Sequence, residues 1–302
     1  MVIAMSTGRD IALHDGDGQR SPNLALMKLS AWHRARGDAV EWWFPLKTER
    51  YARVYSSRVF SWHATDPMLP PDVETGGTGY GDLSKNLPSE IDAMPPDYSL
   101  YPDCDYALGF LTRGCPNTCP WCVVPEKEGA IHAYRDWREV ARPDTRDMVL
   151  MDNNVLACDY GIDQLASLAA TRHRIDFNQG LDARRIDAPI ATRLSALRWM
   201  TSVRLACDSP SMKPIVERAI GLLRTSGIAP TRIMVYCLIR DDISEALDRI
   251  EFIRSLGASP FAQPYRDWRA ATPPPSIEQR RLARWCNHKA IFKTCAFSDY
   301  RG

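Results

Sequence analysis

The middle of the chain alternates between short apolar runs and longer segments whose apolar residues recur at helical spacing. The short runs predict strands at residues 107–112, 147–151, 174–178, 203–207, 232–239 and 260–264. The longer segments predict helices at residues 161–171, 188–197, 213–226 and 243–256. Regular strand–helix alternation is typical of a parallel sheet covered by helices, so we expect an α/β fold. Six such units favour an open, partial (β/α)6 barrel over a closed eightfold one.

The region before this series has a different pattern. Residues 22–36 have apolar positions at helical spacing and predict a helix that Gly37 ends. Two strand-like stretches follow at residues 39–44 and 53–60. Loops rich in Gly and Pro follow at residues 75–81 and 94–102. We therefore expect a small Rossmann-like αβ domain with its linker at residues 1–99.

The region after the series is short. A Pro-rich turn at residues 272–275 precedes one predicted helix at residues 276–293. The chain is thus expected to divide into an N-terminal domain and linker, a barrel at residues 100–270 and a C-terminal helical segment at residues 271–302.

Composition adds little to this picture. The chain has 302 residues, of which 45% are hydrophobic and 25% charged, as in an ordinary globular protein. Lys and Arg number 38 and Asp and Glu 37. The net charge is therefore no argument for or against binding of nucleic acid. No apolar run reaches the roughly 18 residues that cross a bilayer, and the N-terminus does not resemble a signal peptide. We expect a cytoplasmic protein with no membrane partner.

Three of the nine cysteines lie close together. Cys115, Cys119 and Cys122 follow the first predicted strand of the series with C-x3-C-x2-C spacing. Loops at the carboxyl ends of parallel strands carry the sites of α/β folds. Three thiolates suit a four-iron cluster with one open iron, since closed clusters use four Cys. Two alternatives stay open: a zinc site completed by Cys104 or a His, and an electron-transfer cluster completed by Cys104.

This loop, with the aromatic Trp121 before its last cysteine, is similar to the signature of the radical S-adenosylmethionine (SAM) superfamily. The resemblance implies a radical SAM barrel in which Cys115, Cys119 and Cys122 hold a [4Fe–4S] cluster and Trp121 lies at the cofactor site. It also implies SAM as a second cofactor, chelated by the open iron and cleaved reductively. The resulting 5′-deoxyadenosyl radical abstracts hydrogen from a substrate. A reductant such as flavodoxin or ferredoxin is an expected partner.

The same resemblance implies SAM contacts at the ends of the later strands. Asp152 and Asn153 follow the second strand, where family members commonly carry a Gly-Gly-Glu motif that this chain lacks. A polar turn that caps the next helix is the alternative for these two residues. Asp208 follows the fourth strand and is a further candidate contact.

The third strand is followed by the most polar of these stretches. Asn178 and Gln179 are expected to contact SAM there. Arg184 or Arg185 is expected to pair with the SAM carboxylate, since a guanidinium binds a carboxylate with two parallel hydrogen bonds. Asp182 has the alternative role of capping the following helix. No catalytic residue is predicted.

The N-terminal region resembles that of radical SAM proteins with a cobalamin-binding Rossmann domain. The similarity rests on Pro22, the helix after it, Gly37 and the pair Gly76 and Gly77. Cobalamin is therefore a possible cofactor, but it is not favoured because the Asp-x-His-x-x-Gly motif of its lower ligand is absent. The lack of any cysteine before Cys104 argues against a methylthiotransferase.

Three functions remain after these observations. The first is a radical SAM enzyme acting on an unidentified small-molecule or nucleotide substrate. The second is a radical SAM enzyme that modifies a nucleobase or nucleic acid, as scattered arginines would allow. Those arginines are Arg184, Arg185, Arg280, Arg281 and Arg284. The third is a non-enzymatic iron–sulfur or zinc-binding module.

Overall fold

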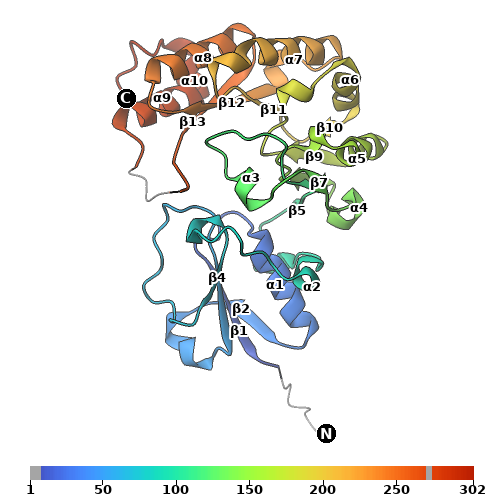
Figure 1. Ribbon diagram of the computed structural model, residues 1–302, viewed down its shortest axis with the longest axis vertical. Coiled ribbons are helices and arrows are strands. Elements are labelled where there is room, and N and C mark those ends of the chain that lie inside the picture. The colour runs from blue at the N-terminus through green and yellow to red at the C-terminus, as the bar shows by residue number, and fades with distance from the viewer. Residues whose placement is uncertain (1–7, 270–273) are drawn as a thin grey trace. The chain divides into compact units, whose positions relative to one another are not determined.

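The computed structural model describes residues 8–269 and 274–302, and it is a mixed α/β protein with parallel sheets (Figure 1). The described residues form two compact units. The first contains residues 8–105 with 267–269, and the second contains residues 106–266 with 274–302. The C-terminal residues therefore group with the helices and strands of the second unit.

The first unit is built on a four-stranded parallel sheet in the order β2-β1-β3-β4. Its strands are β1 (Asp10–Asp15), β2 (Ala39–Trp42), β3 (Arg53–Ser57) and β4 (Glu74–Gly76). Helix α1 (Leu24–Ala35) connects β1 to β2, and the side chain of Asn23 caps its start by accepting a hydrogen bond from the Leu26 backbone N–H. The helix expected at residues 22–36 is thus confirmed. Helix α2 (Ser89–Asp92) is a single short turn.

Strands β1 and β4 were not predicted. β1 buries Ile11, Ala12 and Leu13 in succession because it lies between two other parallel strands of the sheet. β4 lies partly in the stretch expected to be a loop at residues 75–81, and this expectation is wrong for its first residues. Its three residues lack apolar alternation, and they form a strand because β3 offers them a hydrogen-bonding edge.

The second unit contains two parallel sheets. The first has the order β10-β9-β8-β5 and consists of β5 (Ala107–Gly109), β8 (Asp147–Leu150), β9 (Arg174–Phe177) and β10 (Arg198–Trp199). The second has the order β11-β12-β13 and consists of β11 (Val203–Ala206), β12 (Ile233–Ile239) and β13 (Ser259–Pro264). An antiparallel pair, β6 (Thr112–Arg113) with β7 (His132–Ala133), encloses the cysteine loop.

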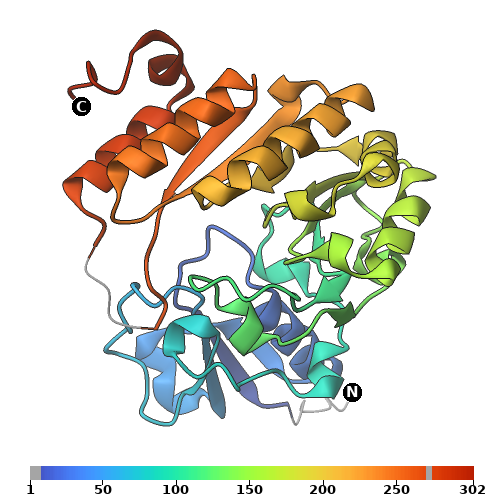
Figure 2. The same cartoon turned by 45° about the horizontal axis from the view of Figure 1, so that its top comes forward.

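Helices cover one face of these strands (Figure 2). They are α5 (Asp159–Ala169), α6 (Ala188–Ala196), α7 (Lys213–Thr225), α8 (Ile243–Ser255), α9 (Ile277–Asn287) and α10 (Lys289–Thr294), with the short α4 (Trp137–Val140). The short α3 (Val124–Lys127) follows the cysteine loop and buries no residue in this core. Strand β12 shows how the core is divided. Ile233, Val235, Cys237 and Ile239 are fully buried in the hydrophobic core, whereas Tyr236 and its alternate neighbours face the other side and are half-buried.

The opposite face of the strands carries a polar network that joins the two sheets. Arg204 of β11 forms an ion pair with Asp176 of β9 and donates a hydrogen bond to the Tyr236 hydroxyl at 2.8 Å. The same hydroxyl donates to the backbone carbonyl of Asn178 at 2.8 Å. Burial raises the pKa of Asp176, although the charge of Arg204 opposes this effect. The network fixes the carboxyl end of β9 relative to β11 and β12.

Two predicted elements of the second unit are divided. The strand expected at residues 107–112 becomes β5 and β6, because the Asp152 carboxylate accepts the backbone N–H groups of Leu111 and Thr112, which therefore do not bond to β8. The single helix expected at residues 276–293 is broken at His288, which has φ −91° and ψ 95° and whose ring caps α10. The other predicted strands and helices of the series are confirmed to within a few residues.

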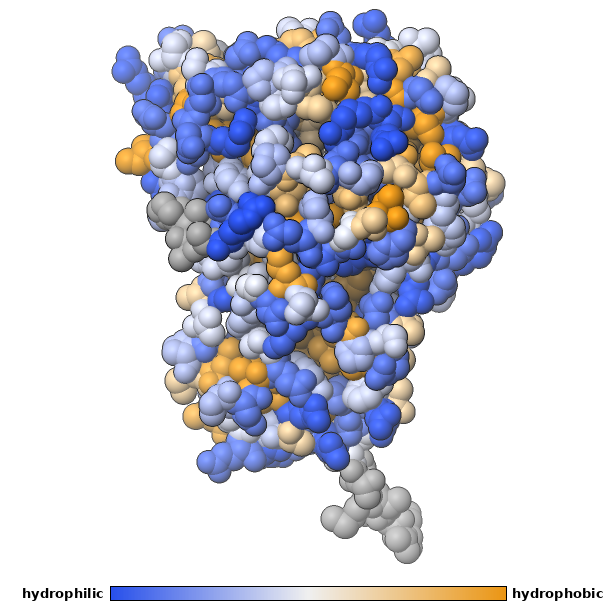
Figure 3. Space-filling model, in the orientation of Figure 1, coloured by the Kyte–Doolittle hydropathy of each residue, from blue (hydrophilic) through white to orange (hydrophobic). Residues whose placement is uncertain are grey.

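Hydrophilic residues cover much of the face shown in Figure 3, and hydrophobic residues lie scattered between them. Within residues 8–269 and 274–302, every helix is too short or too polar to pass through a lipid bilayer.

Candidate functional site

The cysteine loop begins at a position that requires glycine. Gly114, immediately before Cys115, has φ +83°, and a Cβ atom there would lie 2.3 Å from the Ala130 carbonyl oxygen. Its backbone N–H donates to the Glu128 carboxylate at 2.8 Å, and the Cys115 N–H donates to the Gly129 carbonyl at 3.1 Å. These bonds hold the two ends of the loop together, so the residues between them project as one unit.

Glu128 is the central anchor of this closure. Besides Gly114, its carboxylate binds the Arg113 guanidinium at 2.8 Å and accepts a hydrogen bond from the Asn153 amide at 2.9 Å. Asn153 follows β8, so Glu128 ties the cysteine loop to the carboxyl end of that strand. The sequence predicts Asn153 as a SAM contact; in this structure its amide is a support of the loop.

The three thiols of the loop are close enough to influence one another. Burial raises the pKa of Cys119 and of Cys122, and the neighbouring thiols, including Cys115, add to the rise. The Asn154 amide donates to the Cys115 sulfur at 3.4 Å, and the Arg184 guanidinium hydrogen-bonds to Cys119. The loop therefore presents its thiols next to groups from the ends of β8 and β9.

Asp182 is the hub of the site, and the sequence indicated for it only a capping role. Its carboxylate accepts hydrogen bonds from the Asn117 amide at 3.0 Å, the Asn154 amide at 3.0 Å and the Arg184 Nε at 2.7 Å. It also caps the short 3-10 helix Ala183–Arg185. Burial opposes ionisation, but these donors lower the pKa of Asp182 below its ordinary value. One ionised carboxylate thus joins the cysteine loop to two strand ends.

Asp152 is placed beneath the site. Its side chain is 1% exposed and accepts hydrogen bonds from the Thr112 N–H at 2.6 Å, the Thr112 hydroxyl at 2.7 Å and the Leu111 N–H. Burial raises the pKa of Asp152 to about 6. The carboxylate anchors the segment that leads into the cysteine loop, and its predicted contact with SAM stays a prediction.

Asp208 lies close enough to the thiols to influence them, and Trp121 belongs to the cysteine loop itself. Asp208 follows β11 and accepts the backbone N–H of Leu238 at 3.0 Å, and burial raises its pKa. Its carboxylate also contributes to the raised pKa of Cys119. Trp121, inside the loop, lies under the Arg240 guanidinium, which is 5.0 Å from the ring centroid.

Asn178 and Gln179 are placed differently. Gln179 is exposed, and its amide donates to the Asn178 side-chain oxygen at 3.2 Å. Asn178 is held by the Tyr236 hydroxyl through its backbone carbonyl. Their contact with SAM also stays a prediction. Asn154, which no sequence pattern singled out, donates a hydrogen bond to the Cys115 sulfur.

The residues around the loop are of the types that the cofactors suggested by the sequence would need, although the three thiols are not arranged here around one metal ion. Cys115, Cys119 and Cys122 provide the thiolate ligands that iron–sulfur clusters use. The Asn154 side-chain oxygen is buried and accepts no hydrogen bond, so it is available to an amino group. Arg184 offers a guanidinium beside Cys119. In the described ranges 8–269 and 274–302, no three His, Cys, Asp or Glu side chains are arranged to hold a metal ion.

Cys104 is the alternative fourth ligand. It lies in the first unit and is buried, at 7% exposure.

In comparisons with known proteins, neither a protein-family model nor a curated protein matches this chain.

Proposed function

We propose that this protein is a radical SAM enzyme in which Cys115, Cys119 and Cys122 bind a [4Fe–4S] cluster. The observation that carries the proposal is the C-x3-C-x2-C loop itself, which is anchored through Glu128 and Asp182 at the carboxyl ends of parallel strands. When bound, a cluster of this kind supplies the electron that cleaves SAM and so generates the radical that takes hydrogen from a substrate. The two parallel sheets of the second unit support a partial (β/α)6 barrel around this site.

The chain's own residues would bind and orient SAM. The unpaired Asn154 oxygen is suited to accept a hydrogen bond from the methionine amino group. Arg184 is suited to bind the methionine carboxylate, since Asp182 already fixes one edge of its guanidinium through Nε. Asp208 and Trp121 complete the rim on the β11 side. Of these groups Asn154 is buried, Asp208 and Trp121 are half-buried, and Arg184 is exposed.

The proposal extends to the setting of the reaction. A reductant such as flavodoxin or ferredoxin would supply the electron, and the cytoplasm is the proposed location. The substrate is a small molecule or a nucleotide. Of the arginines that suggested nucleic acid, Arg281 hydrogen-bonds the carbonyl oxygen of Tyr300 and lies over Phe297, so it is engaged within the chain.

The test is anaerobic reconstitution with iron and sulfide, followed by dithionite and SAM, with 5′-deoxyadenosine as the product measured. The wild type should bind about four irons and release 5′-deoxyadenosine, and Cys119→Ala should do neither. Cys158→Ala is the matched control, because Cys158 is also a free, partly buried thiol and lies outside the loop. If the protein takes up zinc and never an iron–sulfur cluster, the proposal of a radical SAM enzyme is refuted. A full cluster without SAM cleavage would favour the electron-transfer module instead.

A further inference from the structure

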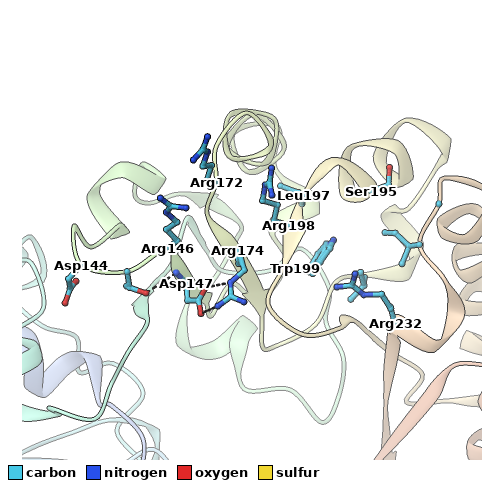
Figure 4. A pocket seen from close by; sticks show the side chains of 14 residues that line it. Asp144, Arg146, Asp147, Arg172, Arg174, Ser195, Leu197, Arg198, Trp199 and Arg232 are labelled. Carbon is cyan, nitrogen blue, oxygen red and sulfur yellow. Dashed lines mark hydrogen bonds and ion pairs between the residues drawn. The ribbon is translucent and has the colours of Figure 1, made fainter.

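The second unit has a large concavity at the end of the strands opposite to the cysteine loop (Figure 4). Its volume is about 1060 Å³, and it is formed at the amino ends of β8, β9, β10 and β11. The four-residue strand β9 separates it from the Asp182 side by about 13 Å. Five arginines line it: Arg146, Arg172, Arg174, Arg198 and Arg232. We call these five residues the arginine cradle.

Strand register places part of the cradle side by side. Arg174 of β9 pairs with Arg198 of β10 on one side and with Asp147 of β8 on the other. Neighbouring strands are about 4.8 Å apart, so the two guanidinium groups start from adjacent positions. Like charges placed in this way are destabilising unless a counter-charge lies between them. Asp147 supplies one, but it is bound to Arg174, through Nε at 2.6 Å.

The other cradle arginines have no such compensation. Asp144, the second carboxylate of the concavity, is bound to Arg142, through Nε at 2.9 Å. Across the described part of the chain, Arg146, Arg172 and Arg198 form no ion pair with a carboxylate. All three are exposed, and Figure 4 shows their side chains extending from neighbouring segments and not toward an acidic partner. The concavity therefore concentrates positive charge in a chain whose net charge is only +1.

The remaining lining indicates what kind of ligand fits. The apolar residues Leu197, Val203 and Ile228 are 6%, 1% and 8% exposed, so they offer almost no contact area. Trp199 donates its indole N–H to the Leu194 carbonyl at 2.9 Å and packs against Phe177. A protein partner would need an apolar centre, and a small organic ligand would need an apolar pocket. Neither is present among the lining residues.

We propose that the arginine cradle binds the phosphate backbone of a nucleic-acid strand. Interfaces with nucleic acids are strongly polar and positively charged, and most of their hydrogen bonds go to phosphate and sugar. A row of guanidinium groups without base-binding surface fits sequence-independent contact of this kind. The proposal does not rest on the radical SAM chemistry at the other end of the strands.

The test uses the full-length protein and a short fluorescein-labelled oligo(U) strand, with binding followed by fluorescence anisotropy. The triple variant R146Q/R172Q/R198Q removes three exposed charges. The matched control R193Q/R218Q/R224Q removes three arginines that are also exposed, on α6 and α7 outside the concavity. Because each variant lowers the net charge equally, a difference between them reports the position of the charges.

We expect the wild type to bind the strand with an affinity that falls steeply between about 50 and 200 mM salt. The cradle variant should lose roughly tenfold to a hundredfold in affinity, and the slope of log K against log salt should shrink by about 2. The control variant should stay within about threefold of the wild type. Circular dichroism should be the same for all three proteins.

Three results would overturn the proposal. The first is no binding of oligo(U) by the wild type at low salt. The second is an equal loss in both triple variants, which would mean a diffuse charge effect. The third is a cradle-dependent interaction with an acidic flavodoxin in place of the strand. Production of 5′-deoxyadenosine by the cradle variant should equal that of the wild type, so a failure here is distinct from failure of the radical SAM proposal.

Discussion

In the second unit, the charged side chains at the two ends of the strands differ in burial and in the partners that they have. At the carboxyl ends, Asp152 and Asp182 are buried and each accepts several hydrogen bonds from neighbouring segments. At the amino ends, Arg146, Arg172 and Arg198 are exposed and without carboxylate partners among the described residues. A buried charge must be matched by fixed partners, whereas an exposed one is stabilised by water. The first end is therefore built for fixed geometry, and the second for attraction of a mobile ligand.

The largest effect is expected at Asp182. The change Asp182→Ala leaves the amides of Asn117 and Asn154 and the Arg184 guanidinium without their shared acceptor. We expect the free energy of unfolding to fall by about 2–4 kcal/mol, because buried donors lose their partner. Urea denaturation measures this. Asp187→Ala is the control, since Asp187 is exposed and caps α6 through the Ile190 N–H alone. That cap is worth about 1 kcal/mol. Equal losses in the two variants would show that Asp182 is no more than a helix cap.

Asp152 should make stability depend on pH. Burial raises its pKa from 3.8 to about 6, so the folded state holds this proton more tightly than the unfolded state. The stability that protonation contributes is complete below about pH 4 and is lost as pH rises through about 6. A shift of about 2 pH units corresponds to roughly 3 kcal/mol.

The measurement compares wild type with Asp152→Asn, which does not titrate, by denaturation at several pH values. The unfolding free energy of the wild type minus that of the variant should decrease by about 3 kcal/mol as pH rises from about 4 to 7. The subtraction removes the titration of other groups. A difference that stays constant, or that rises with pH, would mean that the Thr112 and Leu111 donors outweigh burial and hold the carboxylate ionised.

Arg184 tests the proposed cofactor contact. Removing a guanidinium that binds a carboxylate costs about 1.5–3 kcal/mol, so Arg184→Ala should weaken SAM binding roughly tenfold to a hundredfold. The content of iron and sulfide should not change, because Arg184 supplies no thiolate. Isothermal titration of the reconstituted protein with SAM gives the affinity. Arg185→Ala is the control from the adjacent exposed position. If both variants bind SAM as tightly as the wild type, another group binds the carboxylate.

The same contrast explains what the sequence could predict. Helix α7 was expected at residues 213–226 and occupies Lys213–Thr225, because its apolar spacing is a local property. The C-x3-C-x2-C loop is likewise local. Asp182, by contrast, accepts hydrogen bonds from residues 65 and 28 positions away, and no local pattern records such partners. The cradle was missed for the same reason, since its arginines come from separate loops and strand ends that only the sheet register aligns.

The smallest effect is expected at Arg198, at the amino end of β10. If the cradle arginines are held against their mutual repulsion, Arg198→Gln should raise the free energy of unfolding, by about 0.2–1 kcal/mol, the range measured for neighbouring charges on paired strands. The gain should shrink at high salt, because ions screen exposed charges. Arg193→Gln, on the surface of α6, should change stability little at either salt concentration. If Arg198→Gln instead lowers the free energy of unfolding, the Arg198 side chain has a structural role. The amino ends of the strands would then resemble the carboxyl ends, because their charges would be fixed by contacts within the fold and would not be available to a ligand.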